Sequence, residues 1–343
     1  MRNGLLSVLK CPDCGKSSFR AEEEGRDGTE IRGGRVVCGD CGVPRRIIDG
    51  IVDFLGNPSA DVLREKGAVD AEEYFSDSSG KRYKVNRESV ERFRSQFLLL
   101  PEGDGSYFFR RGGCFQSIAE GAHRFRAAQR LMGLRGGEKV LSLGDGFGYA
   151  SYRFAQSGCS VVALDISSYL LAADAYVAGA YFDRVFSDMH ALPFADGVFD
   201  AVFCSAAMHH SRDLRRAFSE ARRVLKPGGK IFLINESARG VFEKEDPGLA
   251  DLNKRGYSDT AYTIPEWVRS ARASGFRAVR VEFLSLADDY IARQENKGVR
   301  ASNFLKIAYF LRRHRGMENL ILFLLTYPRL LLRPRSWRLV CCK

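Results

Sequence analysis

Between residues 121 and about 286, short apolar segments typical of strands alternate with segments of helical pattern. Strands separated by helices build parallel sheets whose faces the helices cover. This alternation constrains the fold of the 343-residue chain more than any other feature, and it predicts an α/β domain. Hydrophobic residues make up 45% of the chain, enough to fill a core of this kind, which argues against an intrinsically disordered protein.

The chain is basic, with a formal net charge of +11. This charge favours polyanionic or membrane-surface partners without determining the fold. The start of the chain has no signal-peptide core, because Lys10 interrupts a short apolar stretch, and the most apolar segment, 320–332, is too short to span a bilayer. We therefore expect a cytoplasmic protein whose cysteines act as metal ligands or buried thiols before they form disulfides.

Four cysteines form two pairs with the spacing of metal-binding turns: Cys11 with Cys14, and Cys38 with Cys41. Four converging thiolates satisfy tetrahedral Zn²⁺ with no open position, which makes a structural site. A segment of this size depends on the free energy of metal binding for its stability. The spacing predicts a zinc site, with two disulfides or free thiols as the alternatives.

The segment after the second pair, residues 43–55, has the sequence VPRRIIDGIVDFL. Together with the CPDCG start, it resembles short zinc-ribbon domains that act as activator subunits of tRNA and translation-factor methyltransferases, or that are fused in front of methyltransferases. The resemblance covers residues 5–55 and implies a docking or stabilising module. We predict a zinc ribbon over residues 1–56 and a linker or helical cap over 57–120.

A predicted strand, 139–143, runs into the loop GDGFG, residues 144–148, and then into a helix from about Tyr149. Glycines here let the backbone approach a ligand at the carboxyl end of a strand. A dinucleotide-binding G-x-G-x-x-G loop would place its third glycine at position 149, which is Tyr.

Acids end the next two predicted strands. Asp165 follows Gly148 by 17 residues and could accept both ribose hydroxyls, which suits NAD and S-adenosylmethionine equally. Asp188 stands where an adenine amino group could be met. Taken alone, either residue is as readily an ordinary strand-end carboxylate that caps a helix.

The run 138–236, with its glycine loop, two acids and LKPGG turn at 225–229, resembles the class I S-adenosylmethionine-dependent methyltransferases, most closely the small-molecule branch of ubiquinone and menaquinone methylases. The resemblance implies a seven-stranded, doubly wound, Rossmann-like sheet over 121–343. It also implies S-adenosylmethionine as cofactor, bound by residues of the loop and strand ends: Ser142, Gly144, Asp145, Gly146, Gly148, Asp165, Ile166, Asp188, Met189 and Ser205.

One position departs from the family pattern. The family has an acid two residues before the first glycine, near the methionine amino group, and here that residue is Ser142. Asp145, at a variable loop position, is the residue that could compensate. A non-catalytic binding protein with a degenerate pocket remains an alternative.

Methyl transfer from a sulfonium requires that the acceptor be held in line and water excluded, and a base only when the nucleophile carries a proton. His209 and His210 follow the fourth strand, and histidine has a pKa suited to a base near neutral pH. They are the candidate catalytic residues; alternatively, they shape the loop or cap the next helix. His123 is predicted at the surface or in a lid.

The last strand, antiparallel, is predicted at 336–342, which leaves 287–335 as an insertion. Residues 291–335 hold ten Lys and Arg against two Glu, together with dense apolar residues. This composition suits a surface for peripheral contact with the inner membrane or for a lipid carrier. The alternatives are a lid packed on the domain and a nucleic-acid surface, which usually lacks leucine runs.

We predict an S-adenosylmethionine-dependent methyltransferase that transfers a methyl group directly to a small or lipid-linked metabolite. The alternative is an rRNA or tRNA methyltransferase with a zinc-binding recognition module, which the charge also fits. RNA affinity would fall steeply with salt, whereas liposome binding would depend on anionic lipid. The acceptor atom and the oligomeric state do not follow from the sequence.

Overall fold

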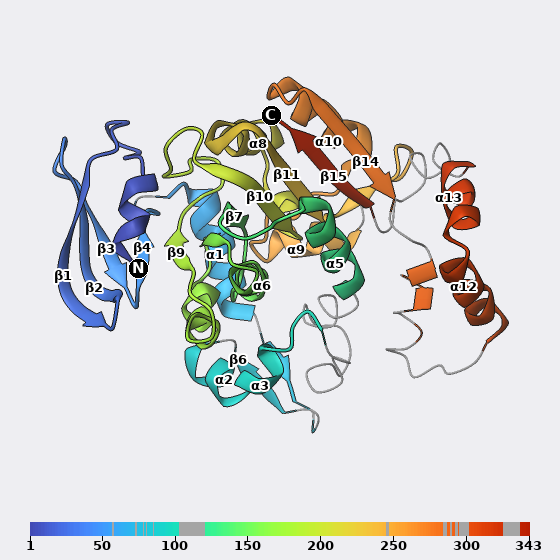
Figure 1. Ribbon diagram of the computed structural model, residues 1–343, viewed down its shortest axis with the longest axis horizontal. Helices are drawn as coiled ribbons and strands as arrows, with labels where there is room; N and C mark the ends of the chain where they lie inside the picture. Colours follow the sequence, from blue (N-terminus) through green and yellow to red (C-terminus); the bar gives the residue numbers. More distant parts are fainter. Residues whose placement is uncertain are drawn as a thin grey trace.

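The computed structural model describes residues 1–56, 58–72, 74–77, 79, 81–84, 86–102, 121–244, 247–283, 287–288, 290–291, 294, 302–324 and 337–343. One sheet of eleven strands runs through this part of the chain, in the order β1-β2-β3-β4-β9-β8-β7-β10-β11-β15-β14 (Figure 1). The helices lie on its two faces.

Seven of these strands form the predicted α/β sheet: β7 (Lys139–Leu143), β8 (Ser160–Asp165), β9 (Asp183–Phe186), β10 (Phe199–Ser205), β11 (Leu225–Ile234), β14 (Ala278–Phe283) and β15 (Trp337–Cys342). The first five pair in parallel, and β15 is antiparallel to both β11 and β14. The seven-stranded, doubly wound sheet predicted from the sequence is confirmed. The predicted LKPGG turn lies inside β11, where the pairing with β10 jumps from Leu225 to Lys230.

The other four strands come from the cysteine-rich segment: β1 (Phe19–Asp27), β2 (Glu30–Cys38), β3 (Pro44–Ile48) and β4 (Ile51–Asp53). They pair antiparallel with one another, and β4 then pairs in parallel with β9. The sheet therefore has eleven strands, where the sequence predicted seven and a separate ribbon. The physical reason is that β9 would otherwise expose a row of unpaired backbone groups, which β4 satisfies.

A buried ionic network joins the ribbon strands to the α/β sheet. Arg184, on β9, is fully buried, and its guanidinium donates to Glu30 Oε1 on β2 at 2.8 Å and to Asp174. Arg32, also on β2, donates to Asp174 Oδ2 at 2.7 Å. Two arginines and two carboxylates thus pair across the junction, where an unpaired charge would be costly.

Helices cover both faces of the sheet, and each face has its own core. One core includes Phe218 and Trp267, from α8 (Leu214–Val224) and α10 (Ile264–Ala273). The other includes Phe125, Phe154 and Tyr176, from α5 (Ala122–Met132), α6 (Tyr149–Gln156) and α7 (Asp174–Val177). Several short elements complete the fold. They are α2 (Arg87–Arg92), α3 (Arg94–Phe97), α9 (Pro247–Lys254), β5 (Tyr74–Ser76), β6 (Arg82–Lys84), β12 (Ala238–Arg239), β13 (Tyr262–Thr263) and the 3-10 helices Asn3–Val8, Ser168–Ala173 and Met208–His210.

Helix α1 (Ala60–Glu72), in the segment predicted as a linker or cap, is fastened beside the loop that follows β8. Asp70 Oδ1 accepts hydrogen bonds from the backbone N–H and the hydroxyl of Ser168, both at 2.8 Å. The Tyr169 hydroxyl donates to Val69 O at 2.7 Å. These contacts hold α1 against the carboxyl edge of the sheet. Residues 103–120 of the predicted cap lie outside the described residues.

The predicted insertion contributes a pair of helices, α12 (Asn303–Arg313) and α13 (Arg315–Leu324), at the end of the molecule opposite the ribbon (Figure 1). They have a small core of their own, in which Leu305 and Ala308 pack with Ala287 and Ile291. Most other residues of 287–335 lie outside the described part of the chain. Within the described residues, no helix has the length and apolar character needed to cross a membrane.

Candidate functional site

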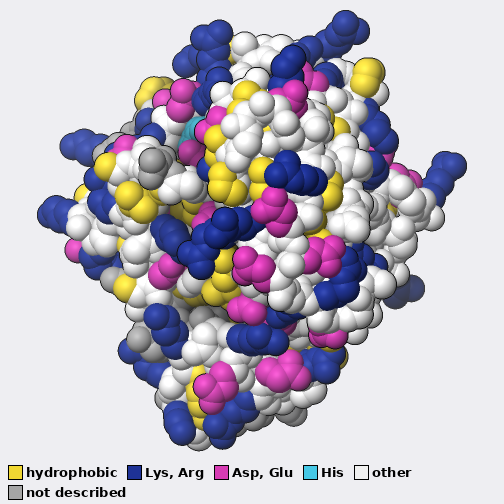
Figure 2. Space-filling view, turned by 90° about the vertical axis from the view of Figure 1, so that its left-hand side faces the viewer, with side chains coloured by type: hydrophobic (Ala, Val, Ile, Leu, Met, Phe, Trp, Pro, Cys, Tyr) yellow, Lys and Arg dark blue, Asp and Glu magenta, His cyan; other side chains and the backbone are white. Residues whose placement is uncertain are grey.

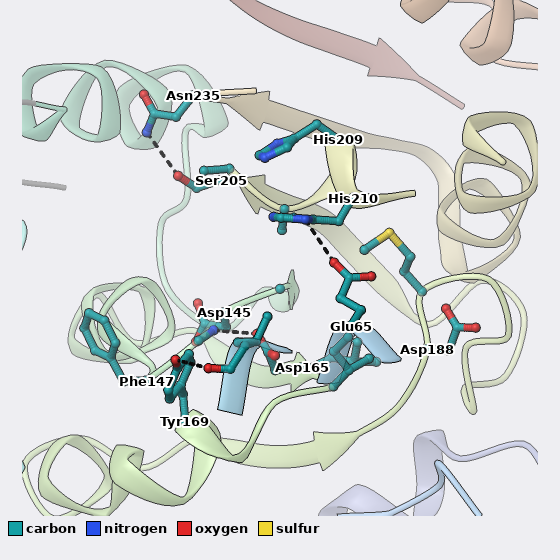
Figure 3. A pocket seen from close by; sticks show the side chains of 18 of the residues that line it. Glu65, Asp145, Phe147, Asp165, Tyr169, Asp188, Ser205, His209, His210 and Asn235 are labelled. Atoms are coloured by element: carbon teal, nitrogen blue, oxygen red, sulfur yellow. Dashed lines mark hydrogen bonds and ion pairs between the residues drawn. The ribbon is translucent and has the colours of Figure 1, made fainter. Parts of the chain in front are cut away.

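A cavity of about 550 Å³ opens at the carboxyl ends of the central strands, between their loops and α1. Most of the predicted cofactor residues and both candidate catalytic histidines line it: Gly144, Asp145, Gly146, Asp165, Ile166, Asp188, Met189, Ser205, His209 and His210. Ser142 lies beneath this layer, and Gly148 begins α6. Figure 3 shows Asp145, Asp165 and Tyr169 on one side of the cavity and His209, His210 and Asn235 across from them.

In the glycine loop, a side chain at either the first or the third glycine would collide with neighbouring residues. Gly144, Gly146 and Gly148 all have positive φ angles, of 63°, 58° and 96°. A Cβ on Gly144 would lie 2.1 Å from the Cβ of Ala207, and one on Gly148 would lie 2.9 Å from the ring of Phe182. A Cβ on Gly146 would meet no atom within 4 Å. The first and third glycines therefore permit close packing, while the second leaves open space beside the cavity.

The carboxylate of Asp165 holds this loop in place by accepting backbone hydrogen bonds. Its Oδ2 accepts the N–H of Gly146 at 2.7 Å and its Oδ1 accepts the N–H of Ser167 at 2.8 Å. Burial raises the pKa of Asp165, although these hydrogen bonds to the ionised form oppose the shift. Each oxygen keeps a second lone pair, so the carboxylate could accept two hydroxyl groups from the cavity side.

Asp145, the acid of the glycine loop, lies against Ser142. The Ser142 hydroxyl donates to Asp145 Oδ1 at 2.7 Å, which puts the two side chains in contact beneath the loop. Asp145 Oδ2 is buried and has no hydrogen-bond partner among the described residues. Burial raises the pKa of Asp145 to about 7, against the hydrogen bond from Ser142 and the effect of the nearby hydroxyl and backbone N–H of Ser151. The orphaned oxygen fits a cationic ligand group such as an ammonium.

Asp188 is held by a histidine that the sequence did not single out. Asp188 Oδ1 is 2.6 Å from His190 Nδ1 and accepts the backbone N–H of His190 at 2.9 Å, while His190 Nε2 is 2.6 Å from the Ser211 hydroxyl. Burial would raise the pKa of Asp188, but the contacts with His190 outweigh it and hold that pKa below its ordinary value. Asp188 therefore faces the cavity as an oriented, ionised acceptor.

The imidazole ring of His209 contacts a carboxylate at each of its two nitrogens. Its Nδ1 lies 2.7 Å from Glu236 Oε2 and its Nε2 lies 3.1 Å from Asp259 Oδ1. Burial lowers the pKa of His209, but the bonds to Asp259 and Glu236 outweigh burial and raise that pKa to about 9. Glu236 also accepts three backbone N–H groups, from residues 207–209. With both nitrogens engaged and a proton retained at neutral pH, His209 is arranged to shape the loop.

His210 has a different environment. Its Nδ1 lies 2.9 Å from Glu65 Oε1, and Glu65 reaches it from α1 across the cavity mouth (Figure 3). The Glu65 side chain is only 10% exposed, whereas that of His210 is 25% exposed. Glu65 was missed from the sequence, because it lies far from the histidines along the chain in a segment without a clear pattern. The two groups are at ion-pair distance, but Nδ1 has no hydrogen-bond partner among the described residues, so Glu65 lies beside a candidate general base without orienting it by a hydrogen bond.

Arg124 and Asn235 also line the cavity and were not predicted. Arg124 Nη1 donates to Asn235 Oδ1 at 3.0 Å, and the Asn235 amide donates to the Ser205 hydroxyl at 3.1 Å. Asn235 directly follows β11 and has a φ of 59°. In the sequence, its position at the end of a buried strand was the only sign that it lines the cavity. These polar groups join the histidines on the side of the cavity opposite the glycine loop.

Two groups of side chains have the geometry of metal ligands. The ligand atoms of Cys11, Cys14, Cys38 and Cys41 all lie within 4.8 Å of one another. The Sγ atoms are 3.7 Å apart for Cys11 and Cys41 and 3.6 Å for Cys14 and Cys38, too far for disulfides. Thiolates at about 2.3 Å from a tetrahedral Zn²⁺ would lie roughly 3.8 Å apart, so the donor set fits zinc.

The second group is His209, His210 and Asp259, whose ligand atoms also lie within 4.8 Å of one another. Here the ion pairs of His209 with Asp259 and Glu236, and of His210 with Glu65, account for the proximity. We therefore interpret this group as a charge cluster of the cavity wall.

Comparisons with known proteins give a consistent result. Residues 141–233 match the sequence profile of a family described as "Methyltransferase domain". The chain is 42% identical over 110 residues to a demethylmenaquinone methyltransferase of Corynebacterium glutamicum, over 32% of this chain and 45% of that protein. It is 32% identical over 218 residues to a demethylmenaquinone methyltransferase of Mycolicibacterium gilvum, over 57% of this chain and 92% of that protein.

Among solved structures, geranyl diphosphate C-methyltransferase from Streptomyces coelicolor has a TM-score of 0.50 at 12% identity, over 83% of this chain and 97% of that one. At this identity the likeness concerns the fold. The chain spans about half the length of several of the curated relatives that it matches.

Proposed function

Since the chain belongs to the class I S-adenosylmethionine-dependent methyltransferases, we propose that it transfers a methyl group from S-adenosylmethionine to a small or lipid-linked acceptor. One observation carries the proposal: the glycine loop, Asp165 and the orphaned oxygen of Asp145 converge at one edge of one cavity. The S-adenosylmethionine sulfonium supplies a methyl group that is already activated for displacement.

The residues present fit this donor. Asp165 would accept the ribose hydroxyls, and Asp188 with Met189 would form the adenine side of the pocket. The buried, unpartnered Oδ2 of Asp145 would receive the ammonium of the methionine part. Gly146 leaves the space that a Cβ would otherwise fill. The donor would thus occupy the side of the cavity formed by the loops after β7, β8 and β9.

On the opposite side, we propose that His210 removes a proton from the acceptor when the nucleophile carries one. Glu65 faces Nδ1, which leaves Nε2 to take that proton, and the Glu65 carboxylate stabilises the imidazolium that results. His209 positions its neighbour by fixing the loop to Glu236 and Asp259. Helix α1 helps to exclude water, because Val62 and Val69 line the cavity beside Glu65.

A small or lipid-linked acceptor is favoured over RNA by the names of the relatives reported above, which are demethylmenaquinone methyltransferases. The surface of the ribbon end supports the same choice. Figure 2 shows Lys and Arg side chains interspersed with Asp and Glu on this face. An RNA-recognition module would present a continuous basic stripe instead.

We further propose that Cys11, Cys14, Cys38 and Cys41 hold one structural Zn²⁺. Four cysteine ligands leave no open coordination position, so the ion would take no part in methyl transfer. Its role would be to stabilise the ribbon strands that complete the sheet at β9.

Titration calorimetry with S-adenosylhomocysteine tests the donor site. We expect one binding site in the wild type and at least a hundredfold weaker binding in Asp165→Ala, because two charge-assisted hydrogen bonds of roughly 1.5–3 kcal/mol each are lost. Circular dichroism should show that the variant is folded. Undiminished affinity in a folded Asp165→Ala protein would overturn the site.

The acceptor class is tested by label transfer from radioactive S-adenosylmethionine to separate lipid, small-molecule and RNA fractions of a cell extract. Label should appear in the lipid or small-molecule fraction. Label found in RNA alone would support the RNA methyltransferase alternative instead.

A further inference from the structure

The large hydrophobic side chains that remain exposed are concentrated in one place. Twelve such side chains are exposed among the described residues, and seven of them lie in the helical hairpin, which we define as residues 302–324. These seven are Phe304, Ile307, Tyr309, Phe310, Met317, Leu320 and Leu324. A concentration of this kind marks an interaction surface, whereas single exposed hydrophobic residues are ordinary.

On α12 the apolar residues form two distinct faces. Leu305 and Ala308 are buried against the segment 287–291 and form the small core of the hairpin. Phe304, Ile307 and Phe310 point elsewhere, because at 3.6 residues per turn they fall within an arc of about 120° that neither buried residue shares. Their side chains are 72%, 54% and 49% exposed. Leu311 falls within the same arc and is partly buried against the hairpin core, so the uncovered part of this second face consists of Phe304, Ile307 and Phe310.

Helix α13 also has an exposed apolar face. Met317, Leu320 and Leu324 fall within an arc of about 60°, and all three are exposed. Its buried polar residue, Glu318, accepts the backbone N–H of Ala287 at 3.0 Å and a hydrogen bond from Arg315 at 2.7 Å. Glu318 therefore anchors the hairpin to the segment before it and adds no exposed negative charge.

Positive charge accompanies the uncovered apolar faces. Lys306 and Arg313 are exposed and lie along one flank of the arc that holds Phe304, Ile307 and Phe310. The hairpin sequence contains four Lys and Arg against one Glu. Apolar side chains flanked by basic ones match a bilayer interface, where the former enter the acyl boundary and the latter meet anionic headgroups.

We propose that the helical hairpin 302–324 docks this protein on the anionic inner surface of the cell membrane. Charge complementarity favours a lipid surface over a second copy of the chain, whose own hairpin would bring like charges together. A lipid-linked acceptor would be present at the same surface, a consequence that rests on the proposed function. The docking itself depends only on the hairpin.

Flotation of the full chain with lipid vesicles tests the proposal. We expect binding to vesicles of phosphatidylcholine with 30% phosphatidylglycerol and much weaker binding to phosphatidylcholine alone. Ile307→Glu/Phe310→Glu and, separately, Leu320→Glu/Leu324→Glu should each lower the partition coefficient at least tenfold. The matched control is Phe242→Glu, which changes an 83% exposed side chain outside the hairpin and should bind as the wild type does.

The basic flank is tested by Lys306→Glu/Arg313→Glu against Lys230→Glu/Lys254→Glu, which changes the net charge equally at exposed positions elsewhere. Only the first pair should weaken binding to anionic vesicles by tenfold or more. Equal losses in both pairs, or equal binding to neutral and anionic vesicles, would refute the proposal.

Two further outcomes would also overturn it. The hairpin variants could convert a dimer into a monomer while no protein binds vesicles, which would assign the face to a second copy. The same residues could control binding to RNA and not to lipid, which would assign it to nucleic acid. S-adenosylhomocysteine titration of each variant separates the two proposals: vesicle binding without ligand binding would refute the donor site alone.

Discussion

At the scale of single residues, Asp145 is the most informative position. The family acid before the first glycine is replaced by Ser142, yet the Ser142 hydroxyl holds the carboxyl group of Asp145 in contact with it. The oxygen that Ser142 does not engage is buried without a partner among the described residues. A buried acceptor without a partner is costly, and a cationic ligand would remove that cost.

The affinity for S-adenosylhomocysteine should therefore depend on pH. Because the pKa of Asp145 is raised to about 7, its carboxyl group is neutral below that pH and ionised above it, and only the ionised form attracts an ammonium. We expect affinity to rise about tenfold between pH 6 and pH 8. Calorimetry in buffers across this range would measure it. Asp145→Asn should bind weakly without this pH dependence, and an unchanged profile in that variant would contradict the assignment.

Glu65 gives a prediction about the candidate base His210. Removing its charge in Glu65→Gln should leave S-adenosylhomocysteine affinity unchanged but lower kcat roughly 10- to 100-fold, because His210 loses the carboxylate that would stabilise the positive charge it takes up with the proton. Steady-state kinetics with the labelled acceptor would test this. A parallel loss of S-adenosylhomocysteine affinity in this variant would point to a merely structural role.

At the scale of elements, the junction of β4 with β9 decides how the ribbon joins the sheet. Backbone hydrogen bonds alone would suit any exposed strand edge, but Arg184 adds specificity by reaching from β9 to Glu30 on β2. Phe54, just after β4, continues the pairing by donating its N–H to Phe186 O at 2.9 Å. The ribbon is therefore held by both backbone and side-chain contacts.

Replacing the buried cation tests this junction. Arg184→Met should lower the free energy of unfolding by about 3–5 kcal/mol, because Glu30 and Asp174 would lose a buried partner. Arg184→Met/Glu30→Met should recover part of that loss, because it removes one of the two carboxylates that Arg184 neutralises. Urea denaturation of the three proteins would measure both effects. Equal stability of the wild type and Arg184→Met would show that the network contributes little.

At the scale of the whole molecule, the ribbon and the catalytic sheet are one continuous layer, with the helical hairpin at the opposite end (Figure 1). The continuity links the cysteine cluster to the donor side of the cavity. β4 pairs with β9, and the loop after β9 carries Asp188. Disorder in the ribbon would remove the partner of the strand that positions this acid.

Zinc removal should accordingly affect both stability and ligand binding. We expect one zinc per chain by plasma mass spectrometry, lost in Cys38→Ser together with several degrees in Tm and at least part of the S-adenosylhomocysteine affinity. Cys342→Ser, which changes a thiol outside the cluster, should keep the metal. A folded wild-type protein without zinc would refute the site.

The sequence by itself determined the α/β sheet and most of the residues that line the cavity at its carboxyl edge. Both follow from local patterns, because each strand, its loop and the next helix are contiguous, and the carboxyl ends of parallel strands must meet at one edge. The spacing of the glycine loop, Asp165 and Asp188 therefore carried enough information to place these residues around one cavity. Each cysteine pair is likewise a single turn that brings its own two thiols together, while the contact between the two pairs depends on the pairing of β1 with β2.

Only the tertiary structure decided which side chains meet across elements. It joined the ribbon to β9, engaged both nitrogens of His209, and brought Glu65 to His210. Such pairs join residues far apart in the chain, for example 154 positions for Arg184 and Glu30, and carry no local signature. Their partners are chosen by burial and charge compensation once the elements pack, so they cannot be inferred from spacing alone.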